Sequence, residues 1–494
     1  MYYQQFTTAN IEERQQRKFL LSARLPSCHY IVVHLDVVTV NKQGKVYHFI
    51  GSRRRRWIAA INRKDWQPLA YQRLCSDHFV GGFRKEKVPE NLDAIVIGSG
   101  IGGMTVAATL AKLGKRVLVL EQHDKAGGCC HTFTEKGFEF EAGVPPKESS
   151  CIVNAVMLHH YKRGAYYPKG GSSEIPFHIT KVIQKFGGRV LVRAPVNRIL
   201  VDNKGAAYGV TVEKGQEDVE VRAPVIISNC GVFNTFQKLL PSHIQTKPEI
   251  QKRLNMMRPG RGCLLVFSGF DATEEELGIS STTIWLFKSN DMDAMWDEYF
   301  SMGKDEAPDN IPMMYFTFPS AKDPTSKIRH PGKSYMIILT MVSYEWFEEW
   351  KDTPVGKRGD DYLTYKRRFG NNVFDWACSQ YPKLRDKLVF QEVSTPLSNT
   401  HYLGSYLGAM YSAEQNLERF QAEAIARNRC DTPVKNLFIS GQDVFSCGIA
   451  GALHGGLLCA STVLRHIVYI DLFMLKKKLK RNKARGTAKH IKLL

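Results

Sequence analysis

Apolar and polar residues alternate in blocks along this chain, and the blocks from residue 93 onward follow the order strand, helix, strand. A short apolar run at residues 94–97 precedes a glycine cluster and an alanine-rich stretch with helical spacing. A second apolar run at residues 117–120 follows and ends at Glu121. This pattern predicts a βαβ unit with two parallel strands.

The later blocks predict further strands and two helices. A helix is expected to end near Phe186 with Ser172 or Ser173 as its N-cap, and an apolar helix is expected to enter at residues 448–451. Runs rich in β-branched and aromatic residues predict strands at 189–192, 196–201, 209–213, 223–228, 263–267, 283–287, 313–318, 335–342 and 436–440.

The spacing of these elements indicates the domain organisation. Helix and strand alternate in residues 91–230 and again in 431–470, whereas 231–430 mixes strand-like runs with charged, aromatic helical stretches. We therefore predict a doubly wound α/β domain, made of the two outer segments, with an inserted α+β domain between them. A small N-terminal extension (1–90) and a basic C-terminal tail (471–494) complete the chain.

The glycine cluster carries the first chemical signal. Gly98 allows a tight turn out of the strand, Gly100 allows the backbone to approach a pyrophosphate, and Gly103 allows the helix to pack closely on the sheet. The helix N-terminus favours an anion, and Glu121 stands where an acid accepts from ribose hydroxyls. A bare glycine pattern is weak, but together with strand, helix, strand and acid it indicates dinucleotide binding.

The charge is concentrated at the two ends of the chain. Residues 1–90 hold 16 basic and 7 acidic side chains, and residues 465–494 hold 10 and 1, which leaves the body nearly neutral within a net charge of +20. Basic ends are typical of nucleic-acid or anionic membrane contact, although solvated charge alone also explains them.

Cysteine and hydropathy patterns bound the environment. The 11 cysteines form no CxxC pair and no regular spacing, which favours free thiols over a disulfide framework. The first residues are polar and lack the apolar core of a signal peptide. The most apolar stretch, residues 457–475, is interrupted by charge, so no ordinary membrane span is expected.

A glycine pair, Gly127 and Gly128, follows the acid, and other segments match alongside it, among them GAYYPKGGSSEIPFHI and GQDVFSCGIAGALHGGLLCAS. As a set they resemble the carotenoid and retinoid oxidoreductases, a phytoene-desaturase-like family of flavoproteins. The resemblance extends over most of residues 92–473. It implies FAD held by Gly98, Gly100, Gly103, Glu121, Gly127, Gly128, Lys169, Gly170, Val196 and Asp443, with the backbone of Val196 facing the adenine.

The implied reaction is the saturation of a double bond in a retinoid or other polyene lipid, with the flavin supplying the hydride. NAD or NADP would reduce the flavin, although no second dinucleotide fingerprint is present, and no residue is assigned as proton donor. The chain departs from the family after Gly143, where about a hundred residues over the flavin are missing. It also has Ser412 where the family tends to have glycine. Flavin binding is therefore better supported than turnover.

Residues 45–83 carry a different resemblance, to the second half of a THAP-type zinc finger, a DNA-binding module. Cys75 and His78 would supply two zinc ligands, but the chain before them offers only Cys28 beside His29, so the zinc site is incomplete. Nucleic acid is a partner only if this finger is real. A DNA-binding protein with an inactive flavoprotein fold, or a chimera of two adjacent genes, is the alternative interpretation.

The C-terminal basic run follows an apolar helix and predicts contact with an anionic membrane face, with a solvated tail as the alternative. Members of the family are associated with the endoplasmic reticulum membrane. The resemblance thus implies that location here.

Overall fold

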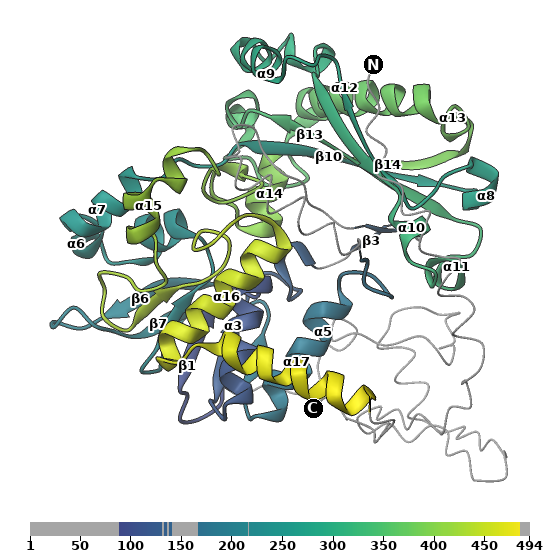
Figure 1. Cartoon of the computed structure of the whole chain (residues 1–494). Helices are drawn as coiled ribbons and strands as arrows, with labels where there is room; N and C mark the ends of the chain where they lie inside the picture. Colours follow the sequence, from purple (N-terminus) through teal and green to yellow (C-terminus); the bar gives the residue numbers. More distant parts are fainter. Residues whose placement is uncertain (1–87, 131–132, 136–137, 141–165, 216, 485–494) are drawn as a thin grey trace. The chain divides into compact units, whose positions relative to one another are not determined.

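The computed structural model describes residues 88–484 apart from 131–132, 136–137, 141–165 and 216. A five-stranded sheet lies at the centre of the dinucleotide-binding half, with the strand order β15-β9-β1-β2-β5 (Figure 1). All four pairings in this sheet are parallel. Its strands are β1 (Ala94–Ile97), β2 (Val117–Leu120), β5 (Arg189–Leu191), β9 (Ile226–Ser228) and β15 (Leu437–Ile439).

Both faces of this sheet are buried, as expected for parallel strands. Ala94 and Val96 of β1 pack with α3 (Ile101–Lys112) and α16 (Gly448–Leu464), whereas Ile95 and Ile97 face a second core on the other side. The alternation follows from the two-residue period of a strand. α5 (Glu174–Lys185) packs beside α3. The predicted doubly wound α/β fold is confirmed.

An antiparallel three-stranded sheet connects β5 to β9. It consists of β6 (Val196–Val201), β7 (Ala207–Lys214) and β8 (Glu217–Arg222) in that order. Sequence reasoning missed β8 because its sequence, EDVEVR, contains no apolar run. The first four of these six residues are exposed.

The inserted half contains a second five-stranded sheet with the order β11-β12-β13-β10-β14. Its pairings are antiparallel, and α12 (Gly359–Gln380) packs on β10 and β14. The strands are β10 (Gly262–Phe270), β11 (Thr283–Phe287), β12 (Met313–Thr317), β13 (Ser334–Val342) and β14 (Leu388–Ser394). The inserted α+β character is also confirmed.

The aromatic residues of this half form the core rather than an open pocket wall. Phe316, Phe318 and Trp346 are buried, and Trp285 and Tyr315 pack partly buried against the same core cluster. Of the two sequence interpretations, ordinary core is the one that the described residues support.

Smaller elements connect these layers. They are η2 (Gly128–Cys130), β3 (Phe133–Glu135), β4 (Phe138–Phe140), η3 (Asn234–Leu239), α6 (Ser242–Gln245), α7 (Pro248–Asn255), α8 (Glu274–Leu277), α9 (Met292–Ser301), η4 (Ala307–Asp309), α10 (Pro319–Lys322), α11 (Ser326–Arg329), η5 (Glu345–Trp350), α13 (Leu384–Lys387), α14 (Pro396–Leu403), η6 (Tyr406–Gly408), η7 (Glu418–Phe420) and α15 (Ala422–Arg427). The predicted helix N-cap at Ser173 is in place, although its side chain makes no capping hydrogen bond.

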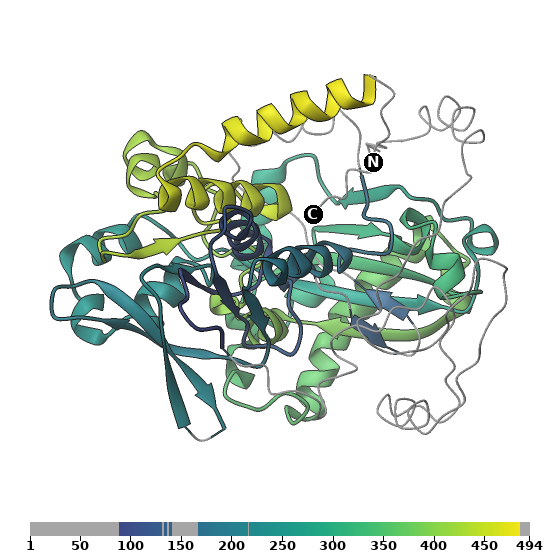
Figure 2. The same cartoon turned by 90° about the horizontal axis from the view of Figure 1, so that it is seen from below.

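Two boundaries differ from the sequence expectation. Several residues of 232–254, together with Ala413, contribute side chains to the core beneath the parallel sheet, although they fall within the predicted inserted domain 231–430. The C-terminal apolar stretch forms two helices, because Arg465 adopts φ +53° and ends α16 before α17 (Val468–Ala484) begins. Figure 2 shows α17, in yellow, as a separate rod.

Residues 45–83, which resemble a zinc finger and include Cys75 and His78, lie outside the described residues. Zinc and nucleic-acid binding therefore stay predictions. In the part of the chain that the structure describes, no group of three or more His, Cys, Asp or Glu side chains is placed to hold a metal ion.

Candidate functional site

The glycine loop leaves β1 at the carboxyl edge of the parallel sheet. Gly98 adopts φ +91°, and its amide donates to the Leu120 carbonyl across 2.8 Å. A Cβ on Gly103 would lie 2.2 Å from the Gly98 carbonyl oxygen. The predicted reasons for these two glycines, a turn and a close helix–sheet contact, are both present.

The loop delivers the N-terminus of α3 to the same edge. Gly100 is its N-cap and has no side chain to cap the first amides. A Cβ on Gly128, which adopts φ +55°, would lie 3.0 Å from the Gly100 Cα. The predicted glycine pair at 127–128 thus lies against the helix start, where unpaired N–H groups and the helix dipole favour a phosphate.

Glu121 lies buried beside this loop, and both of its carboxylate oxygens accept hydrogen bonds. Oε2 accepts from the Ser99 amide at 3.0 Å and the Ser99 hydroxyl at 2.6 Å. Oε1 accepts from the His123 amide at 3.0 Å and lies 2.8 Å from the ring Nδ1. Burial would raise the pKa of Glu121, but the bonds from His123 and Ser99 outweigh it and hold the pKa below its usual value.

His123 connects this carboxylate to the inserted half of the molecule. Its Nε2 lies 2.8 Å from the carbonyl oxygen of His401 in α14. Burial would lower the pKa of His123, but Glu121 and the His401 carbonyl raise it above the ordinary value. Nδ1 faces the Glu121 carboxylate and Nε2 faces the His401 carbonyl, so a protonated ring can donate to both acceptors.

The second half of the site comes from segments far apart in the chain. Asn229 follows β9, and its side-chain oxygen would lie 2.6 Å from a Cβ on either Gly102 or Gly441. Asp443, which is 1% exposed, follows β15. The carboxyl ends of parallel strands meet at one edge of a sheet, where ligands bind in doubly wound folds.

α16 begins at Gly448, at the place that the sequence predicts, and its N-cap Cys447 makes no side-chain capping bond. A Cβ on Gly455 would lie 2.0 Å from the Gly441 carbonyl oxygen, and one on Gly456 would lie 2.5 Å from the Gly102 carbonyl oxygen. These contacts fix α16 against both the β15 loop and α3.

Three predicted cofactor residues lie outside this cluster of contacts. The Gly170 amide donates to Asp323 Oδ2 at 3.1 Å, which attaches its loop to the inserted half, and Lys169 is exposed. Val196 begins β6, two residues after Ala194, whose amide donates to the Glu121 carbonyl at 2.8 Å. Their roles toward a cofactor stay predictions.

Sequence reasoning missed Ser99, His123 and Asn229. Ser99 is fully buried, and its hydroxyl also accepts from the Gly127 amide at 2.9 Å, so it joins the acid to the glycine pair. Asn229 had a recognisable signal, since polar residues directly after buried parallel strands gather at the ligand edge.

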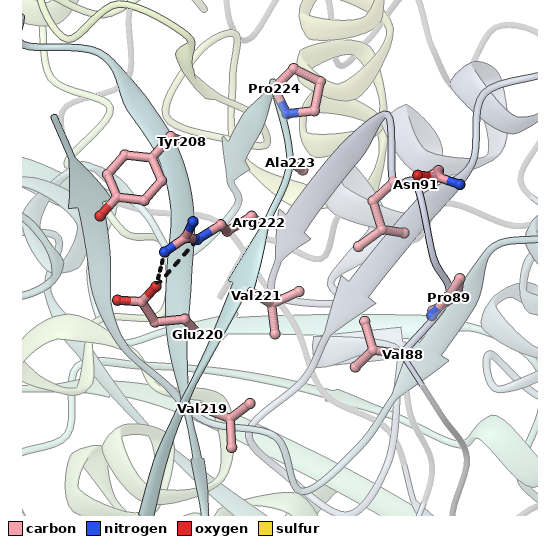
Figure 3. Close-up of a pocket in the computed structure, with 11 residues that line it drawn as sticks. Val88, Pro89, Asn91, Tyr208, Val219, Glu220, Val221, Arg222, Ala223 and Pro224 are labelled. Carbon is pink, nitrogen blue, oxygen red and sulfur yellow. Dashed lines mark hydrogen bonds and ion pairs between the residues drawn. The ribbon is translucent and has the colours of Figure 1, made fainter.

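A separate pocket lies at the other edge of the sheet. Figure 3 shows it between the segment before β1 and strand β8, with an exposed Arg222–Glu220 ion pair of 2.8 Å at its wall. It is shallow and holds no cluster of reactive side chains, so it has no part in the site at the carboxyl edge.

The described residues fit a flavin adenine dinucleotide at its ADP half, because the glycine cradle leaves room for backbone approach and the amides of α3 are not capped. Fold and site together define a dinucleotide-binding flavoprotein oxidoreductase.

Comparison with known families gives the same class. Residues 96–145 match the NAD(P)-binding Rossmann-like domain, and residues 147–464 match the flavin containing amine oxidoreductases. The chain belongs to this flavin containing amine oxidoreductase family, in the branch of the all-trans-retinol 13,14-reductases.

Two relatives from Danio rerio place it in that branch. A protein named inactive all-trans-retinol 13,14-reductase is 42% identical over 544 aligned positions, covering 81% of this chain and 90% of the relative. An all-trans-retinol 13,14-reductase is 34% identical, covering 85% and 94%. A solved oxidoreductase from Methanosarcina mazei is similar at 15% identity with a TM-score of 0.47, covering 76% of this chain and 100% of that one.

The alignment lengths bear on the predicted deletion. The first relative aligns over 544 positions, more than the 494 residues of this chain, so it contains residues without a counterpart here. The predicted deletion after Gly143 falls outside the described residues and stays a prediction.

Proposed function

We propose that this chain binds FAD and reduces the 13,14 double bond of all-trans-retinol or a related polyene lipid. The observation that carries the proposal is the cradle formed by Gly98, Gly103 and Gly128 at the N-terminus of α3. The relatives named all-trans-retinol 13,14-reductase supply the substrate class.

The chain's own residues would hold the cofactor at its pyrophosphate. Gly98 and Gly100 let the backbone approach the pyrophosphate, and the Glu121 carboxylate with Ser99 fixes the loop that carries them. When bound, the flavin supplies the hydride for the reduction of a carbon–carbon double bond.

The name of one relative, an inactive reductase, makes binding and turnover separate questions. Purified protein should be yellow and should release FAD on denaturation. Reduced protein mixed with all-trans-retinol in the absence of oxygen should regain its flavin absorbance and yield 13,14-dihydroretinol. A protein that stays colourless after reconstitution refutes flavin binding, and flavin that stays reduced refutes the reductase activity alone.

We further propose a nicotinamide, NADH or NADPH, as the reductant of the bound flavin. Its support is indirect, since the reaction consumes a hydride and needs a renewable donor. Anaerobic bleaching of the flavin by either nicotinamide supports this step, and bleaching by dithionite alone argues against it.

We also propose attachment to an anionic membrane surface, such as that of the endoplasmic reticulum, through α17. No single described helix is long and apolar enough to cross a membrane; α16 and α17 together have the length and composition but are bent by 113°. Ile470, Phe473 and Met474 of α17 are more than half exposed. The cations that follow them are Lys476, Lys477, Lys478, Lys480 and Arg481.

Apolar side chains followed by cations suit a membrane interface, where each cation adds about 1 kcal/mol near anionic lipid. The full chain should co-sediment with vesicles that contain phosphatidylserine and should be released by high salt. Replacing Phe473 and Met474 by serine should weaken binding without changing the thermal stability. Equal binding of both proteins would count against α17 as the attachment site.

A further inference from the structure

The carboxylate of Asp443 is held by three donors that come from two distant segments. Oδ2 accepts from the Val232 amide at 2.8 Å and from the Ser412 hydroxyl at 2.7 Å, and Oδ1 accepts from the Ala413 amide at 3.0 Å. A carboxylate offers about four acceptor positions. The two amides fix its orientation, and the hydroxyl takes one of the remaining positions.

Ser412 reaches this carboxylate from the connection between the two halves of the molecule. Residues 409–413 run antiparallel to the start of β10, with bridges between Gly262 and Ala409 and between Pro259 and Ala413. The Gly260 amide donates to the Ser412 carbonyl at 2.9 Å. The backbone of this segment is therefore fixed independently of the Ser412 side chain.

The hydroxyl occupies space at the ligand edge of the sheet. A Cβ built on Gly231, which adopts φ +83°, would lie 2.4 Å from Ser412 Oγ and 3.1 Å from Asp443 Oδ2. Gly231 follows β9, two residues after Asn229, which contacts the glycine loop. The hydroxyl thus occupies the space that a side chain at position 231 would take, directly beside the acid.

We propose that Ser412 acts as an internal competitor for the cofactor: its hydroxyl takes the acceptor position on Asp443 that a hydroxyl of the flavin's ribityl chain would use. The inference rests on the proposed function, since it requires FAD at this site. Binding a cofactor hydroxyl through Oδ2 then requires that one internal hydrogen bond be exchanged for another, which leaves little net gain from that oxygen.

Removing the hydroxyl separates the two effects that Ser412 has on the protein. In the apoprotein, Ser412→Ala leaves an acceptor of a buried carboxylate without its donor, so the melting temperature should fall. In the complex the cofactor supplies the missing donor, so affinity should rise by about tenfold, which corresponds to about 1.4 kcal/mol. A side chain with a structural role alone would lower both quantities.

The experiment titrates FAD into wild-type apoprotein, S412A and S412G and follows the quenching of flavin fluorescence. S412T keeps the hydroxyl and should bind FAD as the wild type does, and S379A removes an exposed hydroxyl whose bond stays within α12. Melting temperatures of each apoprotein confirm folding and supply the second readout.

Each possible result either supports or overturns the competitor role of Ser412. Tighter binding by S412A and S412G together with a lower melting temperature supports the competitor role, as does flavin binding by S412G where the wild type binds none. Equal dissociation constants for wild type and S412A overturn it. If all of these proteins fold and none binds FAD, the flavin assignment fails and the inference falls with it.

Discussion

The hydrogen bonds to Glu121 can be tested by a change of one atom. Replacement by glutamine keeps the shape of the side chain but exchanges one acceptor oxygen for an NH₂ group. Because Ser99 supplies two donors to one carboxylate oxygen, the remaining oxygen is best placed there. The NH₂ group then faces His123, whose ring can accept through Nδ1 while Nε2 donates to the His401 carbonyl.

One donor has no acceptor left in that arrangement. The His123 amide, 3.0 Å from Oε1 in the wild type, would face the NH₂ group instead. An orphaned buried N–H costs about 1–3 kcal/mol, and hydrogen bonds lose about 1 kcal/mol when their acceptor loses its charge. We expect E121Q to lower the unfolding free energy by about 3 kcal/mol, and the melting temperature by roughly 3 °C in a chain of this size.

Thermal unfolding of the apoprotein measures this loss without any contribution from flavin. Glu213→Gln on the exposed end of β7 makes the same chemical change where burial is absent, and it should leave the melting temperature within about 1 °C of the wild type. If E121Q melted at the temperature of E213Q, the carboxylate would not be holding the loop, and the reasoning would be refuted.

Two further changes test the same loop. Gly103→Ala places a Cβ 2.2 Å from the Gly98 carbonyl oxygen, so it should lower stability by about 1–3 kcal/mol and reduce the flavin-to-protein absorbance ratio, whereas Gly303→Ala, which meets nothing within 4 Å, should change neither. The shifted pKa values of His123 and Glu121 also predict a pH optimum for stability. The lowered pKa of Glu121 adds stability that is lost as pH falls below about 4.5, and the raised pKa of His123 adds stability that is present below about 6.5 and lost as pH rises through its folded value. The difference in unfolding free energy between wild type and H123Q should therefore peak between these limits, and a difference that does not vary with pH would contradict it.

The sequence predicts the parallel strands well, because β1, β2 and β9 are short runs that are buried along their whole length. It fails at β8, where four residues in succession are exposed, and at β14, whose buried and exposed positions alternate too irregularly to mark a strand. It also places residues 232–254 in the inserted domain, since a helix that packs on a distant sheet has no local mark of its partner.

The same physical reason separates the two parts of the candidate site. Gly98, Glu121 and Gly128 lie within about thirty consecutive residues, so their spacing reflects one βαβ unit and can be read along the chain. Asp443 is positioned by amides and a hydroxyl from segments near 232 and 412, which are distant from it in the chain. A sequence pattern can therefore name that acid as a ligand, but which of its acceptor positions remain open depends on donors that approach it from elsewhere in the chain. Cofactor affinity in this protein should accordingly be more sensitive to changes at position 412, far from any fingerprint, than the glycine motif alone would suggest.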